Sequence, residues 1–283
     1  MRFPSRTYRC IGKNDGISFF EVIIALVIMG VVITSIFKLY VSQHQNYLTQ
    51  DNLTIVQQNA RASIDELGRH IRMSGFDVPL GLPAITAADT NPDTITLTYR
   101  SQNCDTYLAA AMPQPSSELK CATDVSCFNE GQWVYIYEPD SGGGEWFEIT
   151  HVQPGSNHLQ HNTMNLSRAY GEDAIILALT HIKFYVDTLA NPDNPTLMIQ
   201  LIGQKPQIYA DYITDLQFQY RMKNGIVVDA PVVADNIREV LISVTGRTEN
   251  PDYEAKARGN EDPYTYRTYS TSVYLRNAST SSI

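Results

Sequence analysis

The amino-acid sequence predicts an α+β fold in which one long N-terminal helix, membrane-spanning in its first half, packs on a large antiparallel β-rich globular domain. Three features of the 283-residue chain support this prediction. An apolar segment follows a short basic N-terminus, and an amphipathic helical pattern continues directly from it. The rest of the chain consists of short alternating segments separated by turn residues.

The N-terminal leader, residues 1–16, is the basic part of an otherwise acidic chain. Its cations are Arg2, Arg6, Arg9 and Lys13, and its one acid is Asp15. The formal net charge of the whole chain is -9, which leaves 17 basic and 29 acidic residues after the leader. This acidic bulk disfavours a general phosphate-binding surface, so we do not expect nucleic acid to be a partner.

The apolar segment from Ile17 to Phe37 has 21 residues and only one charged side chain, that of Glu21. As a helix it would be roughly 31 Å long, about one hydrocarbon thickness. We therefore predict a single transmembrane part over residues 17–40. Because the basic residues precede it, the positive-inside rule places the N-terminus in the cytoplasm and the globular domain in the periplasm.

The small residue beside this segment, Gly16, lies on its N-terminal side. An ordinary secretory signal has its cleavage site after the apolar core, so that the core is lost. Cleavage after Gly16 would instead remove the leader and leave the apolar helix on the mature protein.

Gly16, the stretch "ISFF", Glu21 and the long apolar helix together resemble the class III signal of type IV prepilins. In that family a dedicated prepilin peptidase cuts after the glycine and methylates the new amine. The resemblance implies cleavage between Gly16 and Ile17, N-methylation of Ile17, and Glu21 at the fifth mature position.

Glu21 is costly in lipid, at about 2.5–3.5 kcal/mol on insertion scales. In a filament of packed helices, the free amine of a neighbouring subunit's first residue would pair with this carboxylate and set the axial register. We therefore predict an assembly role for Glu21. The alternative is that it lies near the interface, reaches the headgroups and does nothing else.

A single apolar stripe continues the helix beyond the membrane. It consists of Leu53, Val56, Ala60, Ile64, Leu67 and Ile71. No proline occurs between Ile17 and Gly75, so we predict one helix over residues 17–75, ending near the glycine. The C-terminal half of this helix would lie on a sheet, and a coiled-coil pairing of the short stripe is the less favoured alternative.

Residues 76–277 show the alternation of half-buried antiparallel strands with one wet face. The strand patterns are carried by Ile95, Leu97 and Tyr99, by Trp133, Tyr135 and Tyr137, by Leu216, Phe218 and Tyr220, by Val240, Ile242 and Val244, and by Tyr269, Thr271, Val273 and Leu275. The stretch "EPDSGGGEWFEITHV" predicts a hairpin, and residues 278–283 predict a disordered tail.

Four stretches of this domain, "DTITLTYR", "EWFEITHV", "NIREVLISVTGRT" and "YRTYSTSVYLRN", resemble those of PilW-type minor pilins. This resemblance implies a pilin-like, low-abundance structural subunit that helps to initiate pilus assembly at the bacterial inner membrane and then lies in the pilus, at its tip. The implied partners are other minor pilins, the major pilin, the prepilin peptidase and the pilus assembly machinery.

Three cysteines, Cys104, Cys121 and Cys127, cluster in a 24-residue window, which suits an oxidising compartment. At most one internal disulfide can form among them. Joining Cys104 to Cys121 or to Cys127 would pin the insertion "MPQPSSE", and the sequence does not select the pair. Three reduced thiols are the alternative, and Cys10 would leave with the leader.

No group of residues predicts catalysis, so we expect a protein that is not an enzyme, with no cofactor and no metal. His151, His158 and His161 lie in a turn-rich stretch without metal-ligand spacing, and we interpret them as surface or strand-edge histidines. No nucleophile, base and orienting group come together in the sequence.

Three other functions remain open. A J-type pseudopilin of type II secretion would use the same helix, and an adhesin or DNA-uptake tip subunit would add a ligand to the same role. A signal-anchored periplasmic enzyme would use the helix as a tether, but a tether gains nothing from a buried acid.

Overall fold

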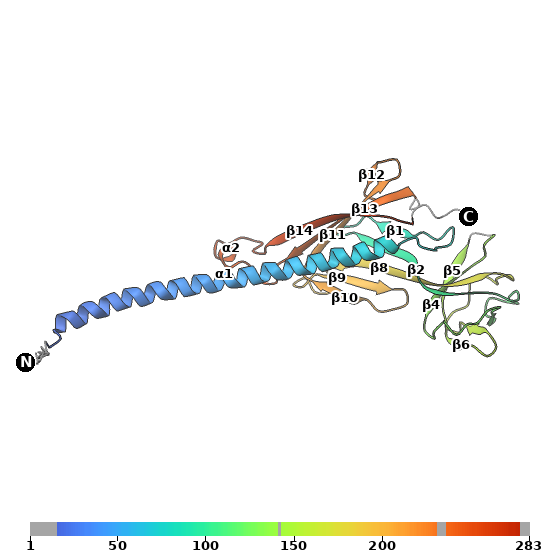
Figure 1. The fold of residues 1–283 in the computed structure, drawn as a ribbon, viewed down its shortest axis with the longest axis horizontal. Coiled ribbons are helices and arrows are strands. Elements are labelled where there is room, and N and C mark those ends of the chain that lie inside the picture. Colours follow the sequence, from blue (N-terminus) through green and yellow to red (C-terminus); the bar gives the residue numbers. More distant parts are fainter. Residues whose placement is uncertain (1–15, 141–142, 231–235, 278–283) are drawn as a thin grey trace, which may run out of the picture. The chain divides into compact units, whose positions relative to one another are not determined.

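The computed structural model describes residues 16–140, 143–230 and 236–277. The predicted leader apart from Gly16, with Cys10, and the predicted tail therefore lie outside the described residues. The chain divides into two compact units, Met1–Asp51 and Asn52–Ile283. The predicted α+β class is confirmed, because one long helix is followed by a domain of antiparallel strands (Figure 1).

Helix α1 (Phe19–Met73) is continuous across the boundary between the two units. It ends two residues before Gly75, which adopts a positive φ of 80° that only glycine reaches without strain. The observed helix is thus shorter than the predicted 17–75 by two residues at each end.

Three antiparallel sheets form the second unit. In the larger sheet the order is β1 (Ile85–Ala88), β2 (Thr94–Tyr107), β8 (Ile175–Asp187), β4 (Trp133–Tyr137) and β5 (Gly144–Glu148), while β9 (Thr196–Leu201) pairs with β8 and β10 (Gln207–Asp211) pairs with β9. The four-stranded sheet has the order β12 (Val227–Val228), β11 (Ile213–Met222), β13 (Ile237–Arg247) and β14 (Tyr266–Tyr274). The small sheet has the order β3 (Leu119–Lys120), β7 (His158–Gln160) and β6 (His151–Gln153), and a short helix α2 (Tyr253–Ala257) precedes β14.

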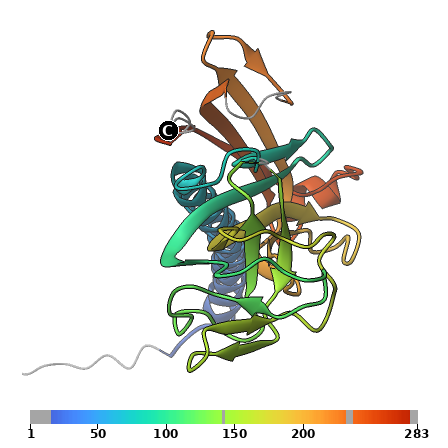
Figure 2. The same ribbon diagram turned by 90° about the vertical axis from the view of Figure 1, so that its right-hand side faces the viewer.

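The main core lies between the C-terminal part of α1 and the two larger sheets, and Figure 2 shows both sheets beside this part of the helix. Ala60, Leu67 and Ile71 of the predicted stripe are fully buried there, and Ile64 packs against them. At Gly68 an added Cβ would lie only 3.5 Å from Cγ2 of Val273 on β14. The helix thus lies against β14 at Gly68, a residue without a side chain.

A second core lies within the segment from Cys104 to Ala178, which carries the small sheet and the β4–β5 hairpin. Val134 and Ile136 face this core and are fully buried, while Tyr135 on the opposite face is also buried in a third cluster. The prediction of one wet face is therefore wrong for β4. Both faces of this strand are covered, because Val134 and Ile136 pack in the second core while Tyr135 packs with Leu177 and Leu179 of β8 in the third cluster.

Candidate assembly site

The N-terminal end of α1 contains the three residues for which the sequence predicts processing and assembly roles. Gly16 and Ile17 precede the helix, and the Ile17 side chain is 79% exposed. The backbone N–H of Ser18 donates a hydrogen bond to Oε2 of Glu21, at 3.0 Å. Ser18 thus stands at the N-cap and Glu21 at the third helical position, which is the spacing of a capping box.

This cap gives Glu21 a partner within its own chain. One of the N–H groups that a helix N-terminus leaves unsatisfied is paired, and a carboxylate in the first turn also opposes the positive end of the helix dipole. The sequence carried the signal, because Ser18 precedes Glu21 by three residues, but the sequence interpretation considered only a partner in a neighbouring subunit.

The apolar segment that follows is uncovered. In the described residues, α1 is the one helix long and apolar enough to cross a membrane, and none of its most apolar window is buried. Its internal polar side chains are satisfied within the helix, since Thr34 donates to the carbonyl of Gly30 at 2.7 Å and Ser35 to that of Val31 at 2.8 Å. The segment therefore offers an apolar surface without unpaired hydroxyl groups.

A buried polar contact fixes the C-terminal part of α1 on the larger sheet. The Nε2–H of His70 donates to Oε1 of Glu66 at 2.9 Å, and Nδ1 accepts from the hydroxyl of Tyr99 on β2 at 2.7 Å. Burial lowers the pKa of His70, and the hydrogen bond to Glu66 acts in the opposite direction. The neutral ring is thus favoured, with both nitrogens paired.

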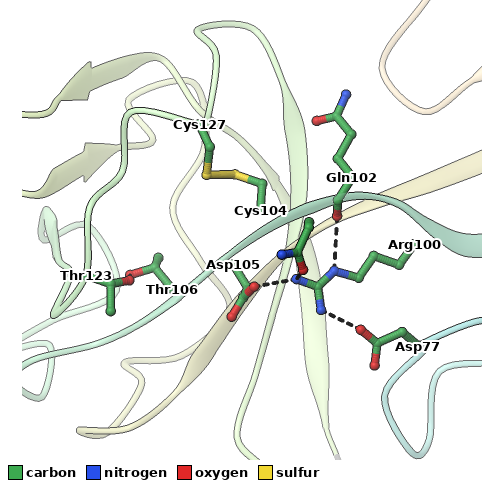
Figure 3. A network of polar contacts seen from close by, with 9 residues as sticks. Asp77, Arg100, Gln102, Cys104, Asp105, Thr106, Thr123 and Cys127 are labelled. Carbon is green, nitrogen blue, oxygen red and sulfur yellow. Dashed lines mark hydrogen bonds and ion pairs between the residues drawn. A yellow bond between two sulfur atoms is a disulfide. The ribbon is translucent and has the colours of Figure 1, made fainter.

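The turn after α1 is held against β2 by backbone and side-chain bonds. The N–H of Gly75 donates to the carbonyl of Thr98 at 3.0 Å, and that of Arg100 donates to the carbonyl of Phe76 at 2.9 Å. The Arg100 guanidinium then pairs with the carboxylates of Asp77 and Asp105, as Figure 3 shows. Arg100 is followed by a register shift in the pairing of β2 with β8, so this network fixes the point where β2 bends.

The disulfide links Cys104 with Cys127, which selects one of the two pairs that the sequence left open. Figure 3 shows it beside the Arg100 network. Cys121 is free and buried, and burial raises the pKa of its thiol to about 11. The remaining thiol is therefore protonated and unreactive in the folded chain.

The three clustered histidines do not come together. His151 pairs with Glu130, and His158 lies 3.4 Å from Glu118. His161 is only 4% exposed, with its ring nitrogens facing two backbone carbonyls, so the interpretation as a surface or strand-edge histidine is wrong for it. It is buried because it packs against Phe147 in the second core. Over the described ranges, no three His, Cys, Asp or Glu side chains group as metal ligands.

A shallow groove lies on the solvent face of the four-stranded sheet. It is lined by neutral polar side chains, among them Gln217, Gln219, Ser243 and Ser270, with Asp229 as its one acid. Ser243 and Ser270 are hydrogen-bonded to each other at 2.8 Å, and Gln219 donates to Asp229 at 3.0 Å. The lining residues thus satisfy one another and include no base beside a nucleophile.

No protein-family model matches the chain, and no curated protein matches it in sequence. Among solved structures, the chain is similar to a type IV-like pilin from Thermus thermophilus, at 7% identity and a TM-score of 0.36, with 81% of this chain and 98% of that chain covered. This likeness is slight, and the fold class follows from the helix and sheets described above.

Proposed function

We propose that this chain is a minor type IV pilin, a non-enzymatic structural subunit that is cut after Gly16 and helps to initiate pilus assembly. The observation that carries the proposal is an uncovered apolar helix with Glu21 as its one early charge, directly after Gly16. The helix continues into a second unit, which begins at Asn52 and has its own buried core. In such a chain, the apolar helix would first be inserted in lipid and would later pack against the helices of other subunits.

Glu21 supports this role because the Ser18 bond uses one of its two carboxylate oxygens. After cleavage, the new amine of Ile17 in a neighbouring subunit would bring a full positive charge to the carboxylate, which the N–H of Ser18 does not, and opposite charges attract strongly where water is excluded. Assembly would then remove the cost of an ionised group in lipid.

The proposed location is the bacterial inner membrane, with the N-terminus in the cytoplasm and the second unit in the periplasm, and later the pilus. The Cys104–Cys127 disulfide supports it, because such bonds persist in the periplasm and at the cell surface and are rare in the cytoplasm. The proposed partners are other minor pilins and the major pilin, the prepilin peptidase and the assembly machinery.

The N-terminal mass of the protein from cells tests the processing step. We expect a mature chain that begins with N-methylated Ile17. Recovery of the intact chain from cells with an active prepilin peptidase would contradict the proposal, whereas a Gly16→Ala control should accumulate the unprocessed form.

Glu21→Gln separates the assembly role from the capping role. Glutamine serves in a capping box as glutamate does, but it carries no charge for the neighbouring amine. We expect Glu21→Gln and Glu21→Ala to be processed and inserted normally and to be lost from sheared pili, measured by immunoblot. Normal incorporation of Glu21→Gln would show that capping is the whole role of this residue.

A further inference from the structure

Strand β14 forms an outer edge of the four-stranded sheet, and within the described chain no strand pairs with its free side. Two bonds fix which backbone groups face outward. The N–H of Leu275 donates to the carbonyl of Arg238, and the N–H of Thr248 donates to that of Thr265, on either side of the regular β13–β14 register. Since alternate residues face the partner in an antiparallel pair, the outward backbone groups belong to Tyr266, Thr268, Ser270, Ser272 and Tyr274.

In the described residues, two other edges are partly covered or irregular. The N–H of Asp93 donates to the carbonyl of Leu216 on β11, and the carboxylate of Asp93 accepts from the N–H of Phe218. The edge strand β10 has a register irregularity before Ala210, and Asn59 of α1 donates to the carbonyl of Asp211. Strand β14 has nine residues and contains no proline, lysine or bulge, and Arg267 near its start is its one charged residue, so most of this edge lacks the usual protection.

The direction of β14 limits what can pair with it. Near the start of β14, Arg267 pairs with Gly246 of β13, and a Cβ added at Gly246 would lie 3.1 Å from Val56 of α1. Near the end of β14, Val273 lies beside Gly68 of α1. Strand β14 therefore runs parallel to the C-terminal part of α1. Antiparallel pairing of two β14 strands would point the C-terminal parts of the two α1 helices in opposite directions.

The flank of α1 beside this edge is basic, although the chain as a whole is acidic. Arg72 lies within 3.6 Å of the position that a Cβ at Gly68 would occupy, and Arg61 is on the same helix face about three turns before Arg72. On β14, Arg267 shares the face of Val273. The described residues form no ion pair with these three arginines. Asp65 is the one acid between them on this flank.

We propose that β14 binds an edge strand of a different membrane-anchored subunit, antiparallel to β14 and with carboxylates on the side facing α1. This inference rests on the proposed function, because it assumes neighbours whose helices all point the same way. Backbone bonds to the five outward residues supply about ten hydrogen bonds, and the three arginines select an acidic strand.

Photo-cross-linking of the full chain in cells tests the proposal. Ser270→Cys carries a benzophenone maleimide at the edge, and Ser243→Cys is the matched control, because its hydroxyl lies 2.8 Å from that of Ser270 but on the central strand β13. We expect at least about tenfold more adduct from position 270, mapped by mass spectrometry to an acidic strand of a chain with its own apolar N-terminal helix. A homodimer adduct, equal yields at both positions, or no adduct would overturn the proposal.

Two further measurements keep the test independent of folding defects. Arg72→Glu in the Ser270→Cys background should lower the adduct about tenfold, whereas Lys183→Glu, exposed on β8, should leave it unchanged. In the isolated full chain in detergent, the amides of Thr268 and Ser270 should exchange with deuterium much faster than that of Thr271. Slow exchange at both would mean that another segment already covers the edge, and the proposal would fail.

The N-terminal mass separates this inference from the proposed function. A processed chain that enters pili through Glu21 but gives no adduct at position 270 would refute the pairing of β14 alone. An unprocessed chain would refute the proposed function, whatever adduct it forms.

Discussion

Removal of the Cys104–Cys127 disulfide should destabilise the segment from Cys104 to Ala178, which forms the second core and contains both tryptophans of the chain. The two cysteines are 23 residues apart in sequence, and the loop-closure entropy of a cross-link over that length gives about 3.4 kcal/mol at about 25 °C. Cys104 is 3% exposed and belongs to the second core, whereas Cys127 is exposed and directly precedes Phe128, which is buried in that core. The bond therefore connects two segments that the native core already holds, and its main effect is on the unfolded chain.

The assay is urea unfolding of the full chain in detergent, followed by tryptophan fluorescence. Trp133 and Trp146 lie on β4 and β5, so their fluorescence reports on the segment that forms the second core. We expect the double variant Cys104→Ala/Cys127→Ala to unfold at a midpoint about 1 to 2 M lower in urea than the parent. Cys121→Ala, which deletes a buried sulfur without breaking a cross-link, is the matched control. A difference between the two variants of less than about 1 kcal/mol would refute the entropic reasoning.

Three further predictions concern the main core and its borders. Leu67→Ala should cost about 3 to 5 kcal/mol of unfolding free energy, because Leu67 is fully buried between α1 and the sheets, as a denaturant titration would measure. Stability should fall as the pH drops below about 6.5, the ordinary pKa of histidine, because the pKa of His70 is lowered in the folded chain and the unfolded chain then binds more protons. His70→Gln should reduce this loss between about pH 8 and pH 5.5, and an unchanged pH profile would contradict the reasoning. Gly203→Ala should lower the thermal midpoint strongly, since Gly203 has a positive φ of 71° and an added methyl group would overlap the ring of Trp133.

The sequence predicted the helix and its buried stripe because both depend on local periodicity. Val56, Ala60, Leu67 and Ile71 recur at helical spacing, and all four are buried. The strand patterns on β2, β4, β11, β13 and β14 were also found, because the predicted residues recur at every second position along each of these strands.

The central strand of the larger sheet was missed. Residues Ile175 to Leu179 form a continuous apolar run, in which four of five side chains are buried. Alternation disappears when a strand is covered on both faces. In β8, Ile176 and Ala178 belong to the second core, while Leu177 and Leu179 belong to the third cluster. The contact between His70 and Tyr99 could not be predicted either, because these residues are 29 positions apart and meet only through the packing of the helix.

At the candidate site, the sequence predicted Gly16, Ile17 and Glu21, and the structure adds a second partner for Glu21. Glu21 was assigned to a neighbouring amine because lipid disfavours a lone charge, yet the N–H of Ser18 already donates a hydrogen bond to its carboxylate. The N–H of Ser18 and the neighbouring amine can act one after the other. Before assembly, the cap keeps the helix N-terminus formed and the carboxylate oriented. A preoriented carboxylate loses less conformational freedom when the amine arrives, and it has two oxygens, of which the Ser18 bond uses one. The cap therefore favours the register contact rather than competing with it, and Glu21→Asp, which keeps the charge but shortens the reach to both partners, should weaken assembly less than Glu21→Gln.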